Sequence, residues 1–430
     1  MHPDFEVLGV YLQANDEFVR VGELVRNADR ITTFHVDESY INLPERPILS
    51  SLFECPGDHD TTVALLRDST NLRGGRGIPA WFENLLPEGA LRQYIEAISG
   101  PMHDFDLLRH VGGDLPGAVI VTSEGMGDHA REEMPTDLRF SLAGVQSKLS
   151  MLKTVDGYEM LENGIGGDTV IKLPSKKHRA LPEVEFSSMR LAASVGIDTA
   201  YVELVPLERL HGIPEELIEA CGPALGVERF DRTLSGQRIH MEDFNQILGV
   251  LSDRKYAAAN DETVLKMSGR FGAGRGCFLQ ACRRAAVNIL VGNTDAHLKN
   301  WSIWYPEPTK GRLSPAYDIV AGAVYDHSDE MALRFRRTRN ASIIDGARFA
   351  RAAVYAGYSP TDVREEIDLV IEKAADTWGA LLQDLPMPTD YAEYLLRRAQ
   401  NLALTQEVGS DFLVPYQAAH HMADGCRLSC

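Results

Sequence analysis

The segment Gly292–Asn300 places an acid, an amide and an amine close together in one short polar stretch. It follows an apolar helical pattern and precedes a strand-like pattern, a setting that holds reacting groups on a rigid support. Asp295 could accept a hydroxyl proton, Lys299 could neutralise a phosphoryl group in transfer, and Asn300 could bind a cation through its amide oxygen. The spacing Asp-x-x-x-x-Asn is that of the catalytic loop of protein kinases. The segment therefore predicts phosphoryl-transfer chemistry.

A second acid, Asp318, follows in the segment Leu313–Ile319, between a turn and an apolar stretch. One carboxylate, one amide oxygen and phosphate oxygens would complete a Mg²⁺ site, because Mg²⁺ prefers oxygen ligands and keeps several waters. Asp295 and Asp318 could instead be ordinary turn residues, since Asp favours turns. Their combination with Asn300 and with motifs upstream favours the catalytic interpretation.

Lys172 lies in the apolar strand-like segment Val170–Leu173. A buried ammonium needs a partner. A nucleotide phosphate supplies one, as does a glutamate from the next helix, where Glu185 is the candidate and Glu183 the reserve. The alternative is a lysine on an edge strand whose amine reaches solvent.

The segment 227–232 lies between the two halves of the sequence and is predicted to be a strand that acts as an inter-lobe hinge. Its backbone could pair with the edge of an adenine, and Phe230 could stack or pack nearby. Asp231 and Arg232 are expected to form a structural ion pair. The alternative is an edge strand with alternating charges.

The segment Ser141–Lys148 holds one glycine, so it is neither a Gly-x-Gly-x-x-Gly loop nor a Walker motif. It could still form a mobile loop whose backbone N–H groups and Lys148 meet phosphates.

The elements that position these groups form a strand-rich first half and a helix-rich second half. Strands are predicted at 9–12, 18–21, 32–36, 118–121, 148–153, 169–173, 202–205, 224–227 and 301–304. Helices are predicted within 61–98, from 104, and at 183–195, 242–255, 277–291, 346–356, 361–382 and 390–405. This order predicts an α+β, two-lobed, protein-kinase-like fold with a strand-rich N-terminal lobe and an all-helical C-terminal lobe.

Three domains are predicted: a strand-rich domain at 1–135, a nucleotide-binding small-lobe core at 136–235 and a helical catalytic lobe at 236–430. A polar linker is expected at 123–137.

The composition excludes several classes of protein. Lys and Arg number 43 against 62 Asp and Glu, a formal net charge of −19, which disfavours broad binding to phosphate backbones. No apolar run approaches the roughly 20 residues that span a bilayer, and the N-terminus lacks the pattern of a secretory signal. Six cysteines without a Cys-x-x-Cys pair fit a reducing cytoplasm. The tail with His420, His421, Cys426 and Cys430 could be a metal cluster, but a frayed terminus explains its irregular spacing better.

In their order and spacing these segments resemble the HipA-type serine/threonine kinase family, the toxin half of bacterial toxin–antitoxin pairs. The stretch Asn293–Asn300 is the most specific match. Phe82–Gly89 and the run from Asp106 to Val119 resemble the family's N-terminal signatures, and Ser141–Lys148 resembles its phosphate-binding loop. The likeness covers nearly the whole chain.

The resemblance implies a role for each candidate residue. Catalysis would involve Asp295 as the base, with His297 and Lys299 as neighbours that help to hold phosphates. Mg²⁺ would be bound by Asn300 and Asp318. ATP would be bound by Ala143, Gly144, Val145, Gln146, Ser147, Lys148, Lys172, Glu185, Glu228, Arg229 and Phe230. Autophosphorylation would fall on Ser141 and switch the kinase off, because a phosphate of charge about −2 opposes the nucleotide phosphates.

We therefore expect an ATP- and Mg²⁺-dependent serine/threonine protein kinase of the bacterial cytoplasm, acting as a toxin on the translation machinery, with aminoacyl-tRNA synthetases as the implied substrate class. The implied partner is a small helix-turn-helix antitoxin, with DNA reached only through it and no membrane involved. One alternative is an antitoxin-bound corepressor with weak or no kinase activity, and another is a small-molecule kinase. The basic segment Arg334–Arg339 could touch DNA or an acidic substrate, or be a solvated hairpin tip.

Overall fold

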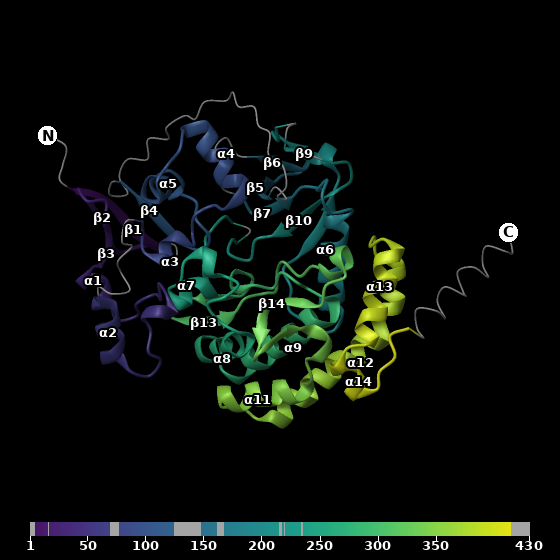
Figure 1. Cartoon of the computed structure of the whole chain (residues 1–430). Helices are drawn as coiled ribbons and strands as arrows, with labels where there is room; N and C mark the ends of the chain where they lie inside the picture. The colour runs from purple at the N-terminus through teal and green to yellow at the C-terminus, as the bar shows by residue number, and fades with distance from the viewer. Residues whose placement is uncertain are drawn as a thin grey trace.

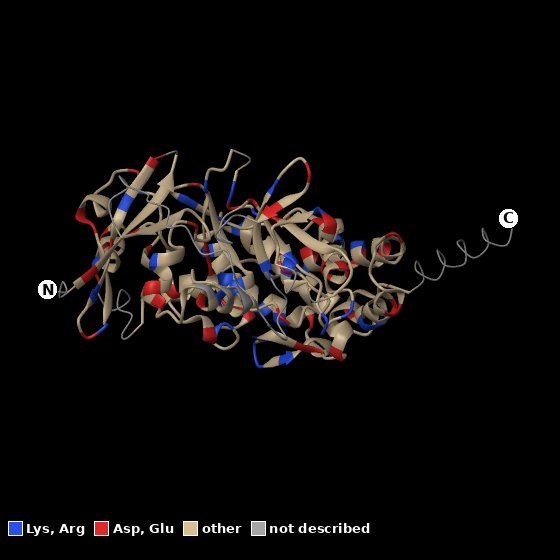
Figure 2. Ribbon diagram, turned by 90° about the horizontal axis from the view of Figure 1, so that it is seen from above, with Lys and Arg blue, Asp and Glu red and all other residues tan. Residues whose placement is uncertain are grey.

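A computed structural model describes residues 5–15, 17–68, 77–123, 148–160, 167–214, 217–218, 220–233 and 235–413. The predicted loop Ser141–Ser147, nearly all of the predicted linker and the tail from His420 to Cys430 lie outside these ranges. The N-terminal sheet and helices α12 (Pro360–Asp384) and α13 (Thr389–Gln400) lie at opposite ends of the molecule (Figure 1). Lys and Arg are interspersed with Asp and Glu along the ribbon (Figure 2).

The N-terminal part is a four-stranded antiparallel sheet in the order β3-β2-β1-β4. Its strands are β1 (Phe5–Ala14), β2 (Glu17–Asn27), β3 (Thr32–Val36) and β4 (Val119–Thr122). Alternate side chains of β1, those of Leu8, Val10 and Leu12, are buried against five helices, as the period of a strand requires. These helices are α1 (Glu38–Ile41), α2 (His59–Arg67), α3 (Ala80–Glu83), α4 (Gly89–Ser99) and α5 (Asp104–Val111).

A six-stranded sheet follows in the order β8-β10-β7-β5-β6-β9. Its strands are β5 (Lys148–Lys153), β6 (Tyr158–Met160), β7 (Thr169–Lys172), β8 (Val202–Val205), β9 (Leu210–His211) and β10 (Ala224–Glu228). Helix α6 (Leu181–Ser194) packs against β8 and β10. Because β7 is paired on both sides, Lys172 does not come from an edge strand, and that alternative is wrong.

The second half is mainly helical and is built around α9 (Arg275–Val291), which is buried along most of its length. The other helices are α7 (Phe244–Leu248), α8 (Asp261–Phe271), α10 (Ala323–Asp326), α11 (Gly346–Ala356), α12, α13 and α14 (Ala403–Val408). The predicted all-helical C-terminal lobe is wrong, because strands lie among these helices. They are β11 (His240–Asp243), β12 (Ser302–Glu307), β13 (Lys310–Leu313), β14 (Glu330–Phe335) and β15 (Thr338–Asn340).

Two local predictions are corrected by long-range contacts. The helix expected at 242–255 spans only Phe244–Leu248, since His240–Asp243 pair with β12, the Asp243 side chain caps α7, and Gly249 ends it with φ of +62°. The strand expected at 227–232 ends at Glu228, and the chain then turns. The segment Arg334–Arg339 does form a hairpin, with β14 and β15 as its arms.

Buried hydrophobic side chains form three clusters, within residues 8–121, 149–224 and 184–412. The last two ranges overlap because residues of α6, β8 and β10 join the helical cluster. The division into three domains therefore stays a prediction. No helix in the described ranges combines the length and the apolar character that crossing a bilayer requires.

The N-terminal part is joined to β11 by a buried polar cluster. The carboxylate of Glu242 accepts hydrogen bonds from Ser50 Oγ (2.6 Å), the Ser51 N–H (2.7 Å) and Trp81 Nε1 (3.1 Å). His240 donates from Nε2 to a backbone carbonyl, that of Leu49, at 2.8 Å. Burial lowers the pKa of His240 to about 4, so the imidazole is neutral near pH 7.

We expect His240 to make folding sensitive to mild acid. An unfolded histidine has a pKa of about 6.5, so between pH 6.5 and 4 the unfolded chain binds the extra proton more readily. The contribution of neutral His240 to the free energy of unfolding is therefore fully present above about pH 6.5 and is lost as the pH falls towards 4. In urea unfolding, the loss of stability from pH 7 to pH 5 should be about 2 kcal/mol smaller for His240→Phe than for wild type. His35→Gln, at an exposed histidine, is the control; equal losses in wild type and His240→Phe contradict the prediction.

Candidate active site

One cavity of about 1230 Å³ is lined by residues from the N-terminal part, the six-stranded sheet and the helical part. Every candidate site residue in the described ranges lines it. They are Lys148, Lys172, Glu185, Glu228, Arg229, Phe230, Asp295, His297, Lys299, Asn300 and Asp318. The remaining candidates, Ser141 and Ala143–Ser147, lie outside the described residues.

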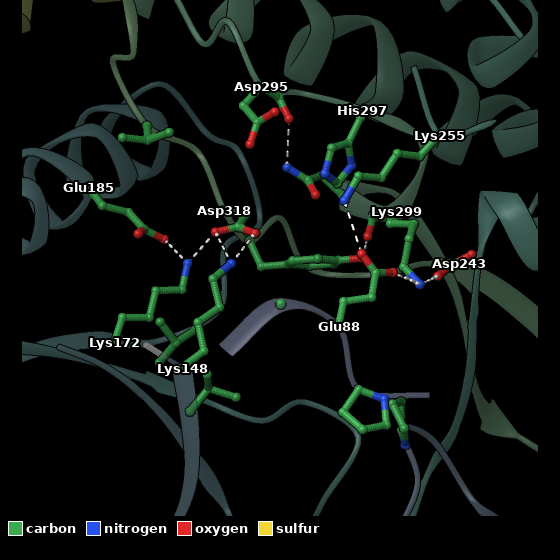
Figure 3. Close-up of a pocket in the computed structure, with 18 of the residues that line it drawn as sticks. Glu88, Lys148, Lys172, Glu185, Asp243, Lys255, Asp295, His297, Lys299 and Asp318 are labelled. Atoms are coloured by element: carbon green, nitrogen blue, oxygen red, sulfur yellow. Dashed lines mark hydrogen bonds and ion pairs between the residues drawn. The ribbon is translucent and has the colours of Figure 1, made fainter. Parts of the chain in front are cut away.

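A charge cluster lines the cavity, with Lys172 and Glu185 buried, Asp318 partly exposed and Lys148 exposed (Figure 3). The ammonium of Lys172 contacts the carboxylates of both Glu185 and Asp318, and Lys148 Nζ lies 3.1 Å from the other oxygen of Asp318. Glu185 is therefore the helix partner of Lys172, and the reserve candidate Glu183 is not needed. The cluster joins a strand, a helix and a distant loop.

Lys172 and Asp318 keep their charges in this cluster. Burial disfavours the charged form of Lys172, but the carboxylates of Asp318 and Glu185 outweigh it and raise the lysine pKa. Burial alone would raise the pKa of Asp318, yet Lys148 and Lys172 outweigh it and lower that pKa. Asp318 is thus ionised, as a metal ligand must be.

The backbone of Asp318 has φ of +58°, a left-handed conformation that is uncommon for a residue other than glycine. The buried amide of Asn293 donates to its carbonyl oxygen at 3.2 Å. Such conformations persist where the surroundings fix them, and they occur often at functional sites.

The segment that carries Asp295 leaves α9 at Gly292, which caps the helix with φ of +73°. The N–H of Asp295 donates to Asn293 Oδ1 (3.2 Å), and its carbonyl accepts from Asn300 Nδ2 (3.0 Å). The backbone of Asp295 is therefore held on both sides while its carboxylate remains exposed. The amide oxygen of Asn300 stays available for a cation.

Tyr256 is a site residue that the sequence did not reveal. Its hydroxyl donates to Asp295 Oδ1 at 2.7 Å, and its ring meets that of His297 edge to face, with centroids 5.1 Å apart. The preceding carbonyl, of Lys255, accepts from the N–H of Leu298 (3.2 Å). Tyr256 lies just beyond a predicted helix, and no motif marked it.

The expected role of Lys299 in holding phosphates is not supported. Its ammonium lies 2.9 Å from Glu88 Oε1, 2.9 Å from the carbonyl of Asn84 and 3.5 Å from Asp243 Oδ2. Figure 3 shows the side chain directed towards Glu88 and Asp243. Lys299 therefore ties the catalytic segment to the N-terminal part. Asn84 and Glu88 belong to the segment 82–89, whose chemical role the sequence did not show.

His297 is buried, and its burial lowers the pKa of the imidazole, so the side chain is neutral near pH 7. Within the described residues its Nδ1 has no hydrogen-bond partner. His297 can therefore serve a ligand as a neutral hydrogen-bonding group rather than as a cation.

The expected adenine hinge lines the cavity, but its backbone is partly engaged. The N–H of Glu228 donates to the carbonyl of Tyr201 (2.9 Å), and that of Arg229 donates to the carbonyl of Asp168 (2.8 Å). These two donors cannot pair with an adenine in this arrangement. The carbonyl oxygen of Arg229 already accepts from the N–H of Arg232 (3.2 Å), so backbone pairing with an adenine at this point would use the carbonyl oxygen of Glu228.

The chain beyond the hinge is held by the N-terminal part. Asp231 and Arg232 form the expected ion pair at 2.8 Å, and Arg229 also binds Asp231, at 2.8 Å. Burial raises the pKa of Asp231, but the two arginines outweigh it and lower that pKa to about 2. Arg232 also lies 2.9 Å from Asp114 Oδ1, and the N–H of Gly117 donates to Asp231 Oδ2 at 2.8 Å.

The donor set suits a hard cation that brings further ligands with it. Asp318 offers a carboxylate and Asn300 an amide oxygen, the ligand types of Mg²⁺. Among the residues that the structure describes, no group of three His, Cys, Asp or Glu could hold a metal by itself. A cation here would need phosphate oxygens and water as additional ligands.

A mixed α/β fold and this set of residues define a protein of the kinase-related class. A sequence model of the HipA N-terminal domain matches residues 10–122, and one of the HipA-like C-terminal domain matches residues 140–378. A putative kinase of Sinorhizobium fredii is 35% identical over 400 residues, 90% of this chain and 96% of the relative. A second putative kinase of that organism is 30% identical over 71% of this chain and 79% of its own length. The chain belongs to the HipA family.

One further relative and one solved structure are also similar to the chain. The serine/threonine-protein kinase toxin HipA of Shewanella oneidensis is 27% identical over 59% of this chain and 65% of its own length. A solved complex of HipA, HipB and operator DNA from the same organism contains a chain of similar fold. The TM-score is 0.72 at 22% identity, over 93% of this chain and 99% of that chain. The family predicted from the sequence is confirmed.

We expect Lys299 and Glu88 to stabilise the folded chain together. In a double-mutant cycle of Lys299→Met and Glu88→Gln, urea unfolding should give a coupling free energy of about 1 kcal/mol, because the ammonium is largely buried. The exposed pair Arg397 and Glu393 on α13 is the matched control and should couple by less than about 0.5 kcal/mol. If the coupling free energy of Lys299 and Glu88 is no larger than that of the control pair, the ion pair does not stabilise the folded chain.

Proposed function

We propose that this chain is an ATP- and Mg²⁺-dependent serine/threonine protein kinase and the toxin of a toxin–antitoxin pair. The observation that carries the proposal is the meeting of Lys172, Asp295, Asn300 and Asp318 at one cavity. These residues come from segments far apart in the sequence. Their types and order are those that phosphoryl transfer requires, and the relatives named as kinases support the same activity.

Lys172 binds the nucleotide phosphates and is held in place by Glu185. Mg²⁺ bound by Asp318 and Asn300 would neutralise phosphate oxygens during transfer. Asp295 accepts a hydrogen bond from the acceptor hydroxyl and takes its proton as the new oxygen–phosphorus bond forms and the bond to the leaving diphosphate breaks. Catalysis rests on positioning and charge neutralisation, with no covalent enzyme intermediate.

Asp295→Asn should abolish phosphoryl transfer, because the amide cannot take the acceptor proton. Wild type incubated with ATP and Mg²⁺ should gain one phosphoryl group, which we propose lies on Ser141, as the family resemblance implies. Asp295→Asn should gain this group at least about a hundredfold more slowly. Intact mass spectrometry with peptide mapping gives both results. Asp253→Asn, at an exposed acid outside the cavity, is the control. Equal labelling of the Asp295 variant would remove its assigned role.

Tyr256→Phe should slow the reaction without weakening ATP binding. The lost hydrogen bond frees the Asp295 carboxylate to rotate away from the acceptor, so kcat should fall by roughly tenfold or more while KM for ATP stays within about twofold. Tyr355→Phe, at an exposed tyrosine on α11, is the matched control. A kcat equal to that of the control would mean that Tyr256 does not position the base.

A small helix-turn-helix antitoxin is the proposed partner, with DNA reached only through it. The solved complex of a relative contains HipB and operator DNA, and a formal net charge of −19 suits a basic partner. A protein of the translation machinery, of the aminoacyl-tRNA synthetase class, is the proposed substrate. Co-purification with such an antitoxin but no nucleotide turnover would favour a corepressor instead, and label on metabolites alone would favour a small-molecule kinase.

A further inference from the structure

The loop between β7 and α6 is basic in an otherwise acidic chain. It runs through Lys176, Lys177, His178 and Arg179, directly after the strand that carries Lys172. Lys177, His178 and Arg179 line the same cavity as the catalytic candidates, beside Tyr325 and Asp326 of α10. The loop therefore borders the place where phosphoryl transfer is proposed to occur.

Aromatic contacts hold this loop against α10 and α13. The rings of His178 and Tyr325 meet edge to face with centroids 4.7 Å apart, and the Tyr325 hydroxyl donates to the carbonyl of Arg179 (3.2 Å). The guanidinium of Arg179 lies 5.5 Å from the Tyr391 ring centroid and 3.2 Å from a carboxylate oxygen of Asp390. The loop is thus a fixed wall of the cavity.

Lys177 differs from the other lysines that line the cavity. Lys148, Lys172, Lys255 and Lys299 each pair with a carboxylate. Lys176 and Lys177 are both exposed, and neither forms an ion pair with any residue that the structure describes. Asp326 also faces this stretch, and Asp390 is engaged by Arg179. The amine of Lys177 therefore remains available to an anion that enters the cavity, and Lys176, its neighbour in the sequence, adds a second exposed amine.

The cavity has room for more than a nucleotide. Sites for small molecules usually measure roughly 300–1,000 Å³, and this cavity measures about 1230 Å³. The charge cluster of Lys148 and Lys172 already provides cations for phosphates. The surplus space and the unpaired amines therefore suit the acceptor.

We propose that Lys176 and Lys177 bind carboxylates of the acceptor protein, so that the enzyme selects a serine or threonine flanked by acidic residues. This inference rests on the proposed kinase function. A single-stranded nucleic acid suits the loop less well, because its binding also uses free aromatic faces on which bases stack. Here Tyr325 and Tyr391 are already covered by His178 and Arg179.

The test is the affinity of the whole chain for a fluorescent peptide with one serine between runs of glutamate, measured by anisotropy. Wild type should bind it at least about tenfold more tightly than the same peptide with glutamine in place of glutamate. The double variant Lys176→Glu, Lys177→Glu should lose this preference. Lys373→Glu, at an exposed lysine of α12 outside the cavity, carries one lysine-to-glutamate change and is the control. Its preference for the glutamate peptide should stay within about twofold of that of wild type.

The affinity for ATP with Mg²⁺ decides whether the loop belongs to the nucleotide site. The double variant should bind ATP within about twofold of wild type, which also shows that it is folded. An equal loss for ATP and peptide would overturn the proposal. Equal binding of both peptides by wild type, no binding of either, or tighter binding of a single-stranded oligonucleotide would overturn it too. Failure of the kinase function is seen separately, as absent phosphoryl transfer to the chain itself.

Discussion

The pairing of buried Lys172 with Glu185 and Asp318 constrains the rest of the site. A buried ammonium without partners is strongly unfavourable, so these two carboxylates must come to the same point although they lie on α6 and on a loop after β13. That requirement couples the six-stranded sheet to the helical part. It also leaves Asp318 neutralised by Lys148 and Lys172 before any nucleotide is present. When a nucleotide and a cation bind, Lys148 and Lys172 would turn from Asp318 to the phosphates, and Asp318 would turn to the cation. Binding would therefore rearrange charges that are already present rather than bring new charge into an apolar site.

The N-terminal part contributes directly to the cavity. Glu88 pairs with Lys299 of the catalytic segment and with Lys255, next to the tyrosine that holds Asp295. Asp114 binds Arg232, beyond the predicted hinge. Both acids lie in the two N-terminal stretches that resemble the family's signatures. Those stretches thus connect the N-terminal part to the two elements that border the proposed nucleotide site, which gives a physical reason for their residue types.

Local patterns predicted elements well where local forces determine them. The strands at 148–153 and 202–205 and the helix at 346–356 have the predicted bounds; in the helix the helical period of the apolar residues matches the buried face. The predicted helix at 242–255 is present only over Phe244–Leu248, because β11 pairs with β12, a partner distant in sequence, and because Gly249 ends the helix. The spacing of the motifs predicted which residues meet at one cavity, but it could not predict the direction of each side chain. Lys299 turns away from the charge cluster because Glu88 and Asp243 lie on its other side.

The residues proposed to catalyse the transfer do not select the acceptor. In the proposed reaction Lys172, Asp318, Asn300 and Asp295 act on the nucleotide or on the transferred group, so none of them distinguishes one hydroxyl-bearing acceptor from another. Selectivity must come from groups on the cavity wall that the reaction leaves unpaired. The acids that line the wall mostly have cationic partners, and four of its five lysines have acidic ones. Lys177 is the exception among the described lysines that line the cavity, and it lies in the loop that contacts α10, which is why we assign it to the acceptor.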